Sequence, residues 1–285
     1  MDCTYGRGGH SEAILARLDA SGRLLLFDRD PAAVRHASSR FAGDPRVGRV
    51  HGSFTRLESE IGARDWTGRI DGVLFDLGVS SPQLQDRDRG FSFLRDGELD
   101  MRFDPGQGAP AHQWLNRAPE SEIALVLKRF GEERFARRIA AAVVAERDAR
   151  PIRRSGQLRD LIVAAVPTRE RDKDPATRSF QAIRIFVNDE ISELQAALPQ
   201  ALRVLRVGGR LAVISFHSLE DRLVKRYFRD QASGDRFPVE IPVTADQIRP
   251  SLRVIGRPVR PGAKESAANP RSRSAVLRVA EKVAA

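Results

Sequence analysis

Short apolar runs alternate with helical patterns along the first part of the chain. Residues 23–27 (RLLLF), 46–51 and 70–76 (IDGVLFD) have the length and apolar content of buried strands, and residues 11–18 have a helical pattern. A further helix is predicted to start at Asp30 and Pro31, because Asp caps helix N-termini and Pro suits the first helical position. Strands separated by helices of this length predict βαβ units and a parallel sheet.

The pattern changes after Pro82. Residues 85–108 are rich in Gly, Asp and Arg and predict a long ordered loop, a kind of segment that is often functional. Successive helical patterns then run through residues 111–166, and a longer helical pattern covers 177–205. An α/β sheet interrupted by a helical insertion accounts for this order.

Strand-like runs return after this helical region. Residues 210–216 (RLAVISF) predict a strand, and residues 239–243 and 275–279 are later strand candidates. We therefore expect three parts, which are the first part of an α/β domain (1–83), a mainly helical insertion (84–187), and the second part of the α/β domain with a basic C-terminal segment (188–285).

The charge of the chain is strongly positive. It has 48 basic and 38 acidic side chains, a net charge of +10 and a pI near 10.7. Residues 249–278 alone hold eight basic side chains and one acid. A basic excess gathered in one segment favours a polyanionic partner such as nucleic acid, although a general solubility bias gives the same sum.

Several classes of protein are excluded by what the sequence lacks. Its single cysteine, Cys3, rules out an internal disulfide framework and a thiolate zinc cluster, and no histidine pattern suggests a metal. No phosphate-binding G-x-x-x-x-G-K-[ST] loop or G-x-S-x-G elbow is present. No apolar run approaches the roughly 18 residues of a membrane helix, and no secretory leader is seen. We expect a cytoplasmic protein without a membrane partner.

A glycine-rich segment, residues 2–11 (DCTYGRGGHS), precedes the first helical pattern. Glycines allow the backbone to approach a ligand closely, and Asp28, at the end of the next strand, could accept both hydroxyls of an adenosine ribose. Dinucleotides and S-adenosylmethionine share these features, but Ser11 stands where the dinucleotide fingerprint has its third glycine. The alternatives are a tight turn for the loop, and for Asp28 a cap of the turn that follows it.

Polar residues follow two further strands. Residues 76–83 (DLGVSSPQ) suit an amino-methyltransferase, whose acceptors must orient a weakly nucleophilic amine, although a Ser-Pro turn is the alternative. In residues 215–221 (SFHSLED), His217 is either a proton acceptor or a member of a capped turn with Ser218 and Asp221. Residues 269–274 (NPRSRS) suit phosphate contacts or form a solvated loop.

Residues 2–11, 70–83, 215–222 and 269–278 together resemble the ribosomal RNA small-subunit methyltransferase H family, also called MraW. Shorter segments resemble it too, and these are residues 89–93, 99–102, 130–136 and 175–182. The resemblance covers essentially the whole chain. It implies transfer of a methyl group from S-adenosylmethionine to N4 of a cytidine in the decoding centre of 16S ribosomal RNA, within the small ribosomal subunit. It also implies a Rossmann-like, seven-stranded class I methyltransferase sheet with an inserted helical domain for substrate recognition.

The resemblance carries roles over to particular residues. The cofactor contacts would be Gly8, Gly9, His10, Asp28, Phe54, Asp76 and Gln83. Candidates for handling the base are Ser80, Ser81 and His217, and candidates for holding RNA are Arg102, Arg178, Arg271 and Arg273. Family members usually begin with an additional segment holding the first half of strand one, so we expect strand one to be shortened here.

Three rival functions remain open on the sequence. A DNA amino-methyltransferase would share the chemistry. A nicotinamide-dependent oxidoreductase is disfavoured by Ser11 and by the charge. A non-catalytic RNA-binding protein with a decayed methyltransferase fold is disfavoured by the intact glycine loop, by Asp28 and by Asp76.

Overall fold

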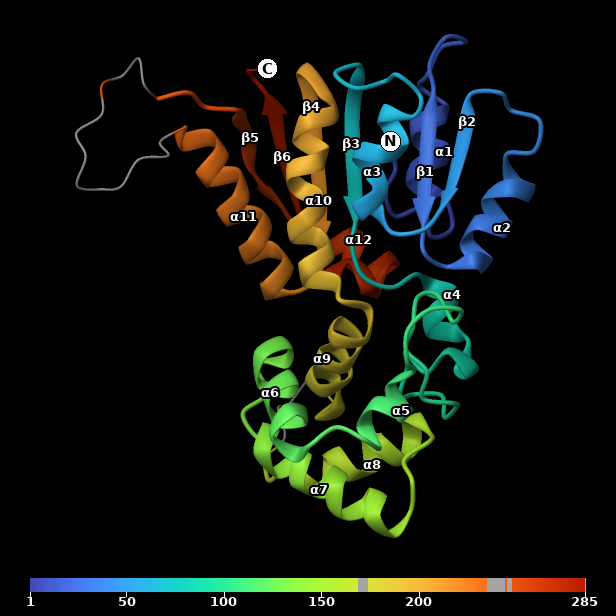
Figure 1. The fold of residues 1–285 in the computed structure, drawn as a ribbon, viewed down its shortest axis with the longest axis vertical. Coiled ribbons are helices and arrows are strands. Elements are labelled where there is room, and N and C mark those ends of the chain that lie inside the picture. The colour runs from blue at the N-terminus through green and yellow to red at the C-terminus, as the bar shows by residue number, and fades with distance from the viewer. Residues whose placement is uncertain (169–173, 235–243, 245–247, 285) are drawn as a thin grey trace. The chain divides into compact units, whose positions relative to one another are not determined.

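The computed structural model describes residues 1–168, 174–234, 244 and 248–284 (Figure 1). These residues divide into two compact units, one formed by Met1–Gly78 with Ile191–Ala285 and the other by Val79–Glu190. The boundaries expected from the sequence, 84 and 187, differ from these by a few residues. The strand expected at 239–243 lies outside the described residues.

The first unit holds the sheet. Its strands are β1 (Leu24–Asp28), β2 (Val47–His51), β3 (Ile70–Asp76), β4 (Leu205–Ser215), β5 (Leu252–Val259) and β6 (Val276–Lys282). Strand β1 pairs with β2 and β3 pairs with β4, both in parallel, as the sequence predicts for this part. Strand β6 pairs antiparallel with β4 and with β5, so the last part of the sheet is not parallel.

The N-terminal residues join the two halves of the sheet. Asp2 bridges in parallel to Leu26 of β1 and to Leu74 of β3. The amide of Asp2 donates to the Leu25 carbonyl (3.0 Å), and the amide of Cys3 donates to the Leu74 carbonyl (2.9 Å). The described residues therefore contain six strands, not the seven expected. A short extended segment lies between β1 and β3, in the place of the seventh.

Helices cover both faces of this sheet. Those of the first unit are α1 (Gly9–Leu15), α2 (Pro31–Arg40), α3 (Leu57–Gly62), α10 (Glu190–Val204), α11 (Ser218–Ser233) and α12 (Ala263–Ala268). In β1, Leu25 and Phe27 pack with α3 and α10, whereas Leu24 and Leu26 pack with α1 and α2. Successive strand side chains point to opposite faces, which is why this strand is apolar at every position.

Local signals place two helix boundaries. The Asp30 carboxylate accepts from the Ala32 amide (2.8 Å) and Pro31 is the first residue of α2, which confirms the predicted start. The single long helix predicted over 177–205 is wrong, because two helices fill that range. Helix α9 (Ala176–Asn188) ends at Asp189, whose φ of 51° is left-handed, and α10 follows at once.

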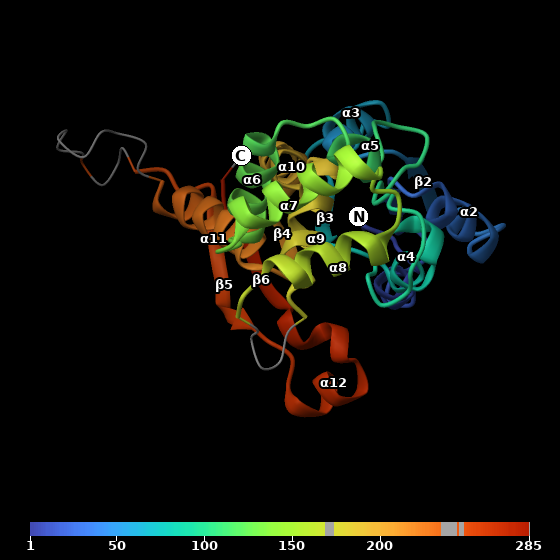
Figure 2. The ribbon, with the colours of Figure 1, turned by 90° about the horizontal axis from the view of Figure 1, so that it is seen from below.

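The second unit is mainly helical. It holds α4 (Ser81–Gln85), α5 (Ala111–Leu115), α6 (Glu120–Gly131), α7 (Ala136–Ala149), α8 (Ser155–Ala165) and α9. Helix α6 packs against both α7 and α9 (Figure 2), and one apolar cluster runs through these helices. Among the helices described in either unit, none combines the length and apolar character needed to cross a bilayer.

Candidate functional site

The glycine loop between the N-terminal segment and α1 needs glycine at position 8. Gly8 has a φ of 82°, and a Cβ added there would lie 2.6 Å from the Tyr5 ring. A Cβ added at the next residue, Gly9, would meet no heavy atom within 4 Å among the described residues. Tyr5 itself is held by a 2.7 Å hydrogen bond between its hydroxyl and Nδ1 of His36. One side of the loop is therefore packed against Tyr5, and the side at Gly9 is open.

Asp28 ties the end of β1 to this loop. Its Oδ2 accepts from the Gly6 amide and its Oδ1 accepts from the Asp30 amide, each at 2.8 Å. Burial raises the pKa of the Asp28 carboxyl to about 6. Each carboxylate oxygen has a second lone pair, so Asp28 can cap the turn after β1 and still accept the hydroxyls of a ribose.

Asp2 is a site residue that the sequence analysis missed. Its side chain is buried, accepts from the Ser11 hydroxyl (2.5 Å) and accepts from the Thr4 amide (3.1 Å). Burial raises the pKa of the Asp2 carboxyl. Asp2 thus holds both ends of the glycine loop. The sequence feature that could have revealed this role is Ser11, which stands in place of the third glycine of the dinucleotide fingerprint and binds Asp2.

His10 and Asp76, two of the predicted cofactor contacts, lie together. Nε2 of His10 is 3.4 Å from Oδ2 of Asp76, and this contact raises the pKa of the His10 imidazole. The Asp76 amide donates to the Thr4 hydroxyl (2.6 Å), which fixes the end of β3 against the start of the loop. The two side chains are partly exposed, so they form an accessible polar pair beside the glycine loop.

Phe54 lies just beyond β2. The Gly52 amide donates to the Asp28 carbonyl (2.9 Å), so the segment after β2 is held against the end of β1. The Phe54 ring is half-buried and packs edge-on against the Phe75 ring, with the ring centroids 5.3 Å apart. One part of an aromatic surface is therefore left accessible in the neighbourhood of Asp28.

His217 acts as a helix cap. It precedes α11, and its Nδ1 accepts from the Glu220 amide (3.4 Å), while its Nε2 lies 3.1 Å from Oε1 of Glu220. The expected capped turn with Ser218 and Asp221 is present, since Ser218 begins α11 and the Asp221 amide donates to the His217 carbonyl (3.1 Å). The Asp221 carboxylate forms a two-point ion pair with Arg278 of β6 instead of contacting the imidazole (2.7 and 3.0 Å). The use of His217 as a proton acceptor stays a prediction.

Ser80, Ser81 and Gln83 belong to the second unit. Ser80 precedes α4, and its amide donates to Oε1 of Gln83 (2.8 Å) in a capping box. Gln83 is buried and Ser81 is exposed. Gln83 therefore has a structural role in the capping box, and its contact with the cofactor stays a prediction.

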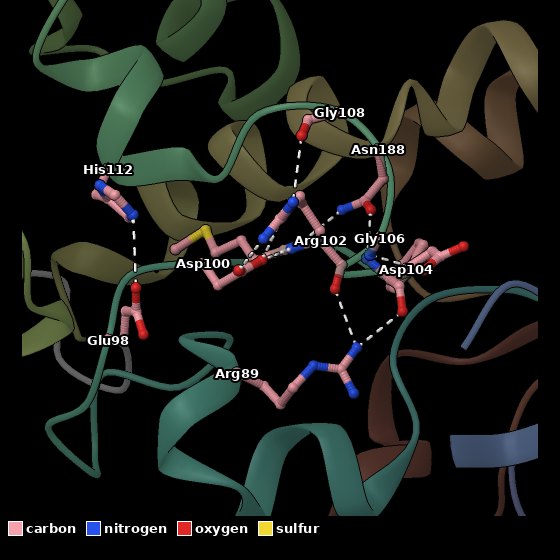
Figure 3. A network of polar contacts seen from close by, with 11 residues as sticks. Arg89, Glu98, Asp100, Arg102, Asp104, Gly106, Gly108, His112 and Asn188 are labelled. Carbon is pink, nitrogen blue, oxygen red and sulfur yellow. Dashed lines mark hydrogen bonds and ion pairs between the residues drawn. The ribbon is translucent and has the colours of Figure 1, made fainter. Parts of the chain in front are cut away.

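Arg102 has an internal partner. Its Nε and Nη2 donate to the two carboxylate oxygens of Asp100 (2.9 and 2.6 Å), and its Nη1 donates to the Gly108 carbonyl (3.2 Å) (Figure 3). In the same network Asn188 of α9 accepts from the Phe103 amide and donates to the Met101 carbonyl, each at 2.7 Å. Arg102 therefore orders the long loop, and the sequence did not reveal that role.

The other predicted RNA contacts lie in two places. Arg178 is on α9, and a Cβ added at Gly131 of α6 would lie 2.7 Å from its carbonyl oxygen. Arg271 and Arg273 are exposed on the short helical turn η3 (Pro270–Ser274), which Ser272 anchors by donating to the Asn269 carbonyl (2.8 Å).

The order β2, β1, N-terminal segment, β3, β4, β6, β5, with a glycine loop and Asp28 at the strand ends, defines a Rossmann-like sheet of the class I methyltransferase type. The model of the MraW methylase family matches residues 1–283, so the chain belongs to that family.

Solved structures similar to this chain share little of its sequence. A protein assigned as an rRNA methylase from Clostridium thermocellum is 13% identical, with a TM-score of 0.44 over 99% of this chain and 87% of that one. An rRNA methylase from Streptococcus thermophilus is 12% identical, with a TM-score of 0.42 over 99% and 85%. A protein assigned as a methyltransferase from Streptococcus mutans, in complex with SAH, is 11% identical, with a TM-score of 0.42 over 99% and 86%.

Proposed function

We propose that this protein transfers a methyl group from S-adenosylmethionine to N4 of a cytidine in the decoding centre of 16S ribosomal RNA, acting in the cytoplasm on the small ribosomal subunit. The observation that carries the proposal is the hydrogen bond from the Gly6 amide to Asp28 Oδ2, in a chain of the MraW methylase family. It brings a glycine loop and a ribose-type carboxylate to the same edge of a sheet, where such folds bind ligands.

The residues of the first unit fit S-adenosylmethionine. The open side of Gly9 leaves room for the methionine part, and the remaining lone pairs of Asp28 suit the ribose hydroxyls. The accessible part of the Phe54 ring offers a surface for the adenine. Asp76 is an acceptor for the amino group, and His10 is already in contact with it.

When bound, the cofactor supplies a methyl group on a positively charged sulfur. The chain's part is to orient the exocyclic amine of the base, whose lone pair is delocalised into the ring and reacts poorly without help. We assign this task to Ser80 and Ser81, whose oxygens can accept the N–H bonds of the amine. After transfer the nitrogen carries an extra proton, which it can lose to water. The cytidine must be unpaired or flipped out to reach these groups.

RNA phosphates would be held by basic residues. Arg271 and Arg273 are exposed on an anchored turn, a placement that suits contacts with a phosphate chain. The net charge of +10 would steer RNA towards the protein and make binding dependent on salt.

The test uses small ribosomal subunits from cells that lack this methylation. The subunits are incubated with the protein and methyl-labelled S-adenosylmethionine, and the labelled nucleoside is identified by mass. We expect N4-methylcytidine at one position. Label on another nucleoside, or stronger labelling of competing DNA, would reject the proposed substrate. Cofactor binding by calorimetry without transfer to any of these acceptors would favour an RNA-binding protein that lacks catalysis.

A further inference from the structure

The turn from α6 into α7 carries basic side chains on both sides. Lys128 and Arg129 end α6, Arg134 lies in the turn, and Arg137 and Arg138 begin α7. All five are exposed. We call these five residues the α6–α7 cluster.

The α6–α7 cluster lacks carboxylate partners among the residues that the structure describes. Elsewhere in the same unit several arginines are paired, as Arg150 is with Glu146 (2.9 Å) and Arg154 is with Asp96 (2.6 Å). In the turn itself, Glu133 is buried and accepts from the Phe135 amide (2.9 Å), and Glu132 has a polar contact of its own. Among the described residues, therefore, no carboxylate forms an ion pair with the cluster.

Two of the guanidinium groups lie over aromatic rings. The Arg129 guanidinium carbon is 5.2 Å from the Phe130 ring centroid, and that of Arg134 is 5.8 Å from the Phe135 ring centroid. Both rings pack against the apolar cluster of the unit. A guanidinium that rests on a ring has less freedom to lose on binding, so these two are ordered before a ligand arrives.

Helix stability explains only part of the cluster, because Lys128 and Arg129 lie in the last turn of α6, where cations favour the helix dipole. Arg137 and Arg138 lie in the first turn of α7, which has no acidic residue. Cations at a helix N-terminus oppose the helix dipole and destabilise the helix. Unpaired like charges gathered around one turn also repel one another. An external anion would remove both costs.

We propose that the α6–α7 cluster binds the phosphate backbone of the substrate RNA. The spacing of basic side chains along two helices suits a polyanion rather than a single small anion. The main chain of Arg178 lies against Gly131 at the same turn, so the cluster continues a position already expected to contact RNA. This inference rests on the proposed function, and it places phosphate contacts on the helical unit.

The test is the salt dependence of RNA binding. The full-length triple variant Arg134→Gln, Arg137→Gln, Arg138→Gln is compared with the wild type, using anisotropy of a labelled 16S decoding-centre fragment. Loss of three phosphate contacts should reduce the slope of log K against log salt by about 2 to 3. The matched control is Arg56→Gln, Arg150→Gln, Arg203→Gln, which removes the same charge from exposed positions paired with Glu60, Glu146 and Glu58.

Each outcome decides the proposal. A reduced slope in the cluster variant and a nearly unchanged slope in the control support it, provided that both keep the wild-type unfolding temperature and cofactor affinity. Equal slopes in the two variants would overturn it. Loss of binding to assembled subunits with unchanged binding to the RNA fragment would also overturn it, since the cluster would then contact protein. A failure of the proposed function is separate, because it appears as missing N4-methylcytidine with the wild-type protein.

Discussion

Ser11 donates a 2.5 Å hydrogen bond to the buried carboxylate of Asp2. It does so at the position where a dinucleotide-binding loop has its third glycine. Asp2 lies between β1 and β3, so this bond fixes the start of α1 to the middle of the sheet. The serine that argued against a dinucleotide site is thus an internal support of the glycine loop.

Removing this bond should destabilise the fold. In Ser11→Ala the Asp2 carboxylate stays buried and loses a donor, which we expect to lower the free energy of unfolding by about 1–3 kcal/mol. The control is Ser38→Ala on α2, whose hydroxyl donates to the Val34 carbonyl at an exposed position. Urea unfolding measures both variants. Equal losses in the free energy of unfolding would show that the buried Ser11–Asp2 bond stabilises the fold no more than an exposed hydrogen bond does.

Cofactor binding should depend on the ionisation of Asp28. Its carboxyl has a pKa of about 6, raised by burial, and only the ionised form has all its lone pairs free for hydroxyl donors. Affinity for S-adenosylhomocysteine should therefore be constant well above pH 6. Below pH 6 it should weaken by up to about tenfold per pH unit, because a proton must then leave before the ligand binds.

The variant Asp28→Asn separates this effect from other titrations. Loss of charge-assisted hydrogen bonds should weaken binding about 10- to 100-fold at pH 8, which corresponds to about 1.5–3 kcal/mol. Calorimetry should also find its affinity less dependent on pH between 5 and 7 than that of the wild type. An affinity at pH 8 equal to that of the wild type would remove Asp28 from the cofactor site.

The sequence predicted the sheet better than it predicted the contacts. The apolar run of β1 and the Asp30–Pro31 start of α2 are local signals, and both hold in the structure. Strand β5 was not predicted at all, and the antiparallel direction of β6 was missed because periodicity does not encode strand direction. The role of Asp2 was missed because it depends on two strands that are distant in sequence.

Roles of single polar residues were the least predictable. Arg102 was expected to contact RNA, but Asp100 occupies two of its donors, and a charge pattern alone does not show which acid an arginine binds. For His217 the sequence predicted the capped turn with Ser218 and Asp221, but it missed the contact of the imidazole with Glu220 at the i+3 position that a helix cap uses. Whether either residue also serves the reaction stays a prediction.

Substitution of Gly8 should lower both stability and cofactor affinity, whereas substitution of Gly9 should lower cofactor affinity alone. Gly8→Ala places a Cβ against the Tyr5 ring at a left-handed φ, so we expect loss of stability and of cofactor affinity together. Gly9→Ala meets no described atom within 4 Å, so the fold should be retained while the open side of the loop is narrowed for the ligand. Thermal unfolding and calorimetry on both variants check this. Unchanged affinity in Gly9→Ala would place the cofactor away from that side.

The His10–Asp76 pair gives a prediction on proton binding. Asp76 raises the pKa of the His10 imidazole, so the charged pair is fully present below the ordinary histidine range and is lost as the pH rises through the raised value. In Asp76→Asn the His10 pKa, followed by NMR, should fall back towards 6.5. His10 is about half exposed, with 51% of its side chain accessible, so the pair should add little to stability. A cofactor amino group bound to Asp76 should compete with His10 and lower its pKa as well. If the His10 signal titrates identically in the wild type, in Asp76→Asn and with S-adenosylhomocysteine bound, then Asp76 interacts neither with His10 nor with the cofactor amino group in solution.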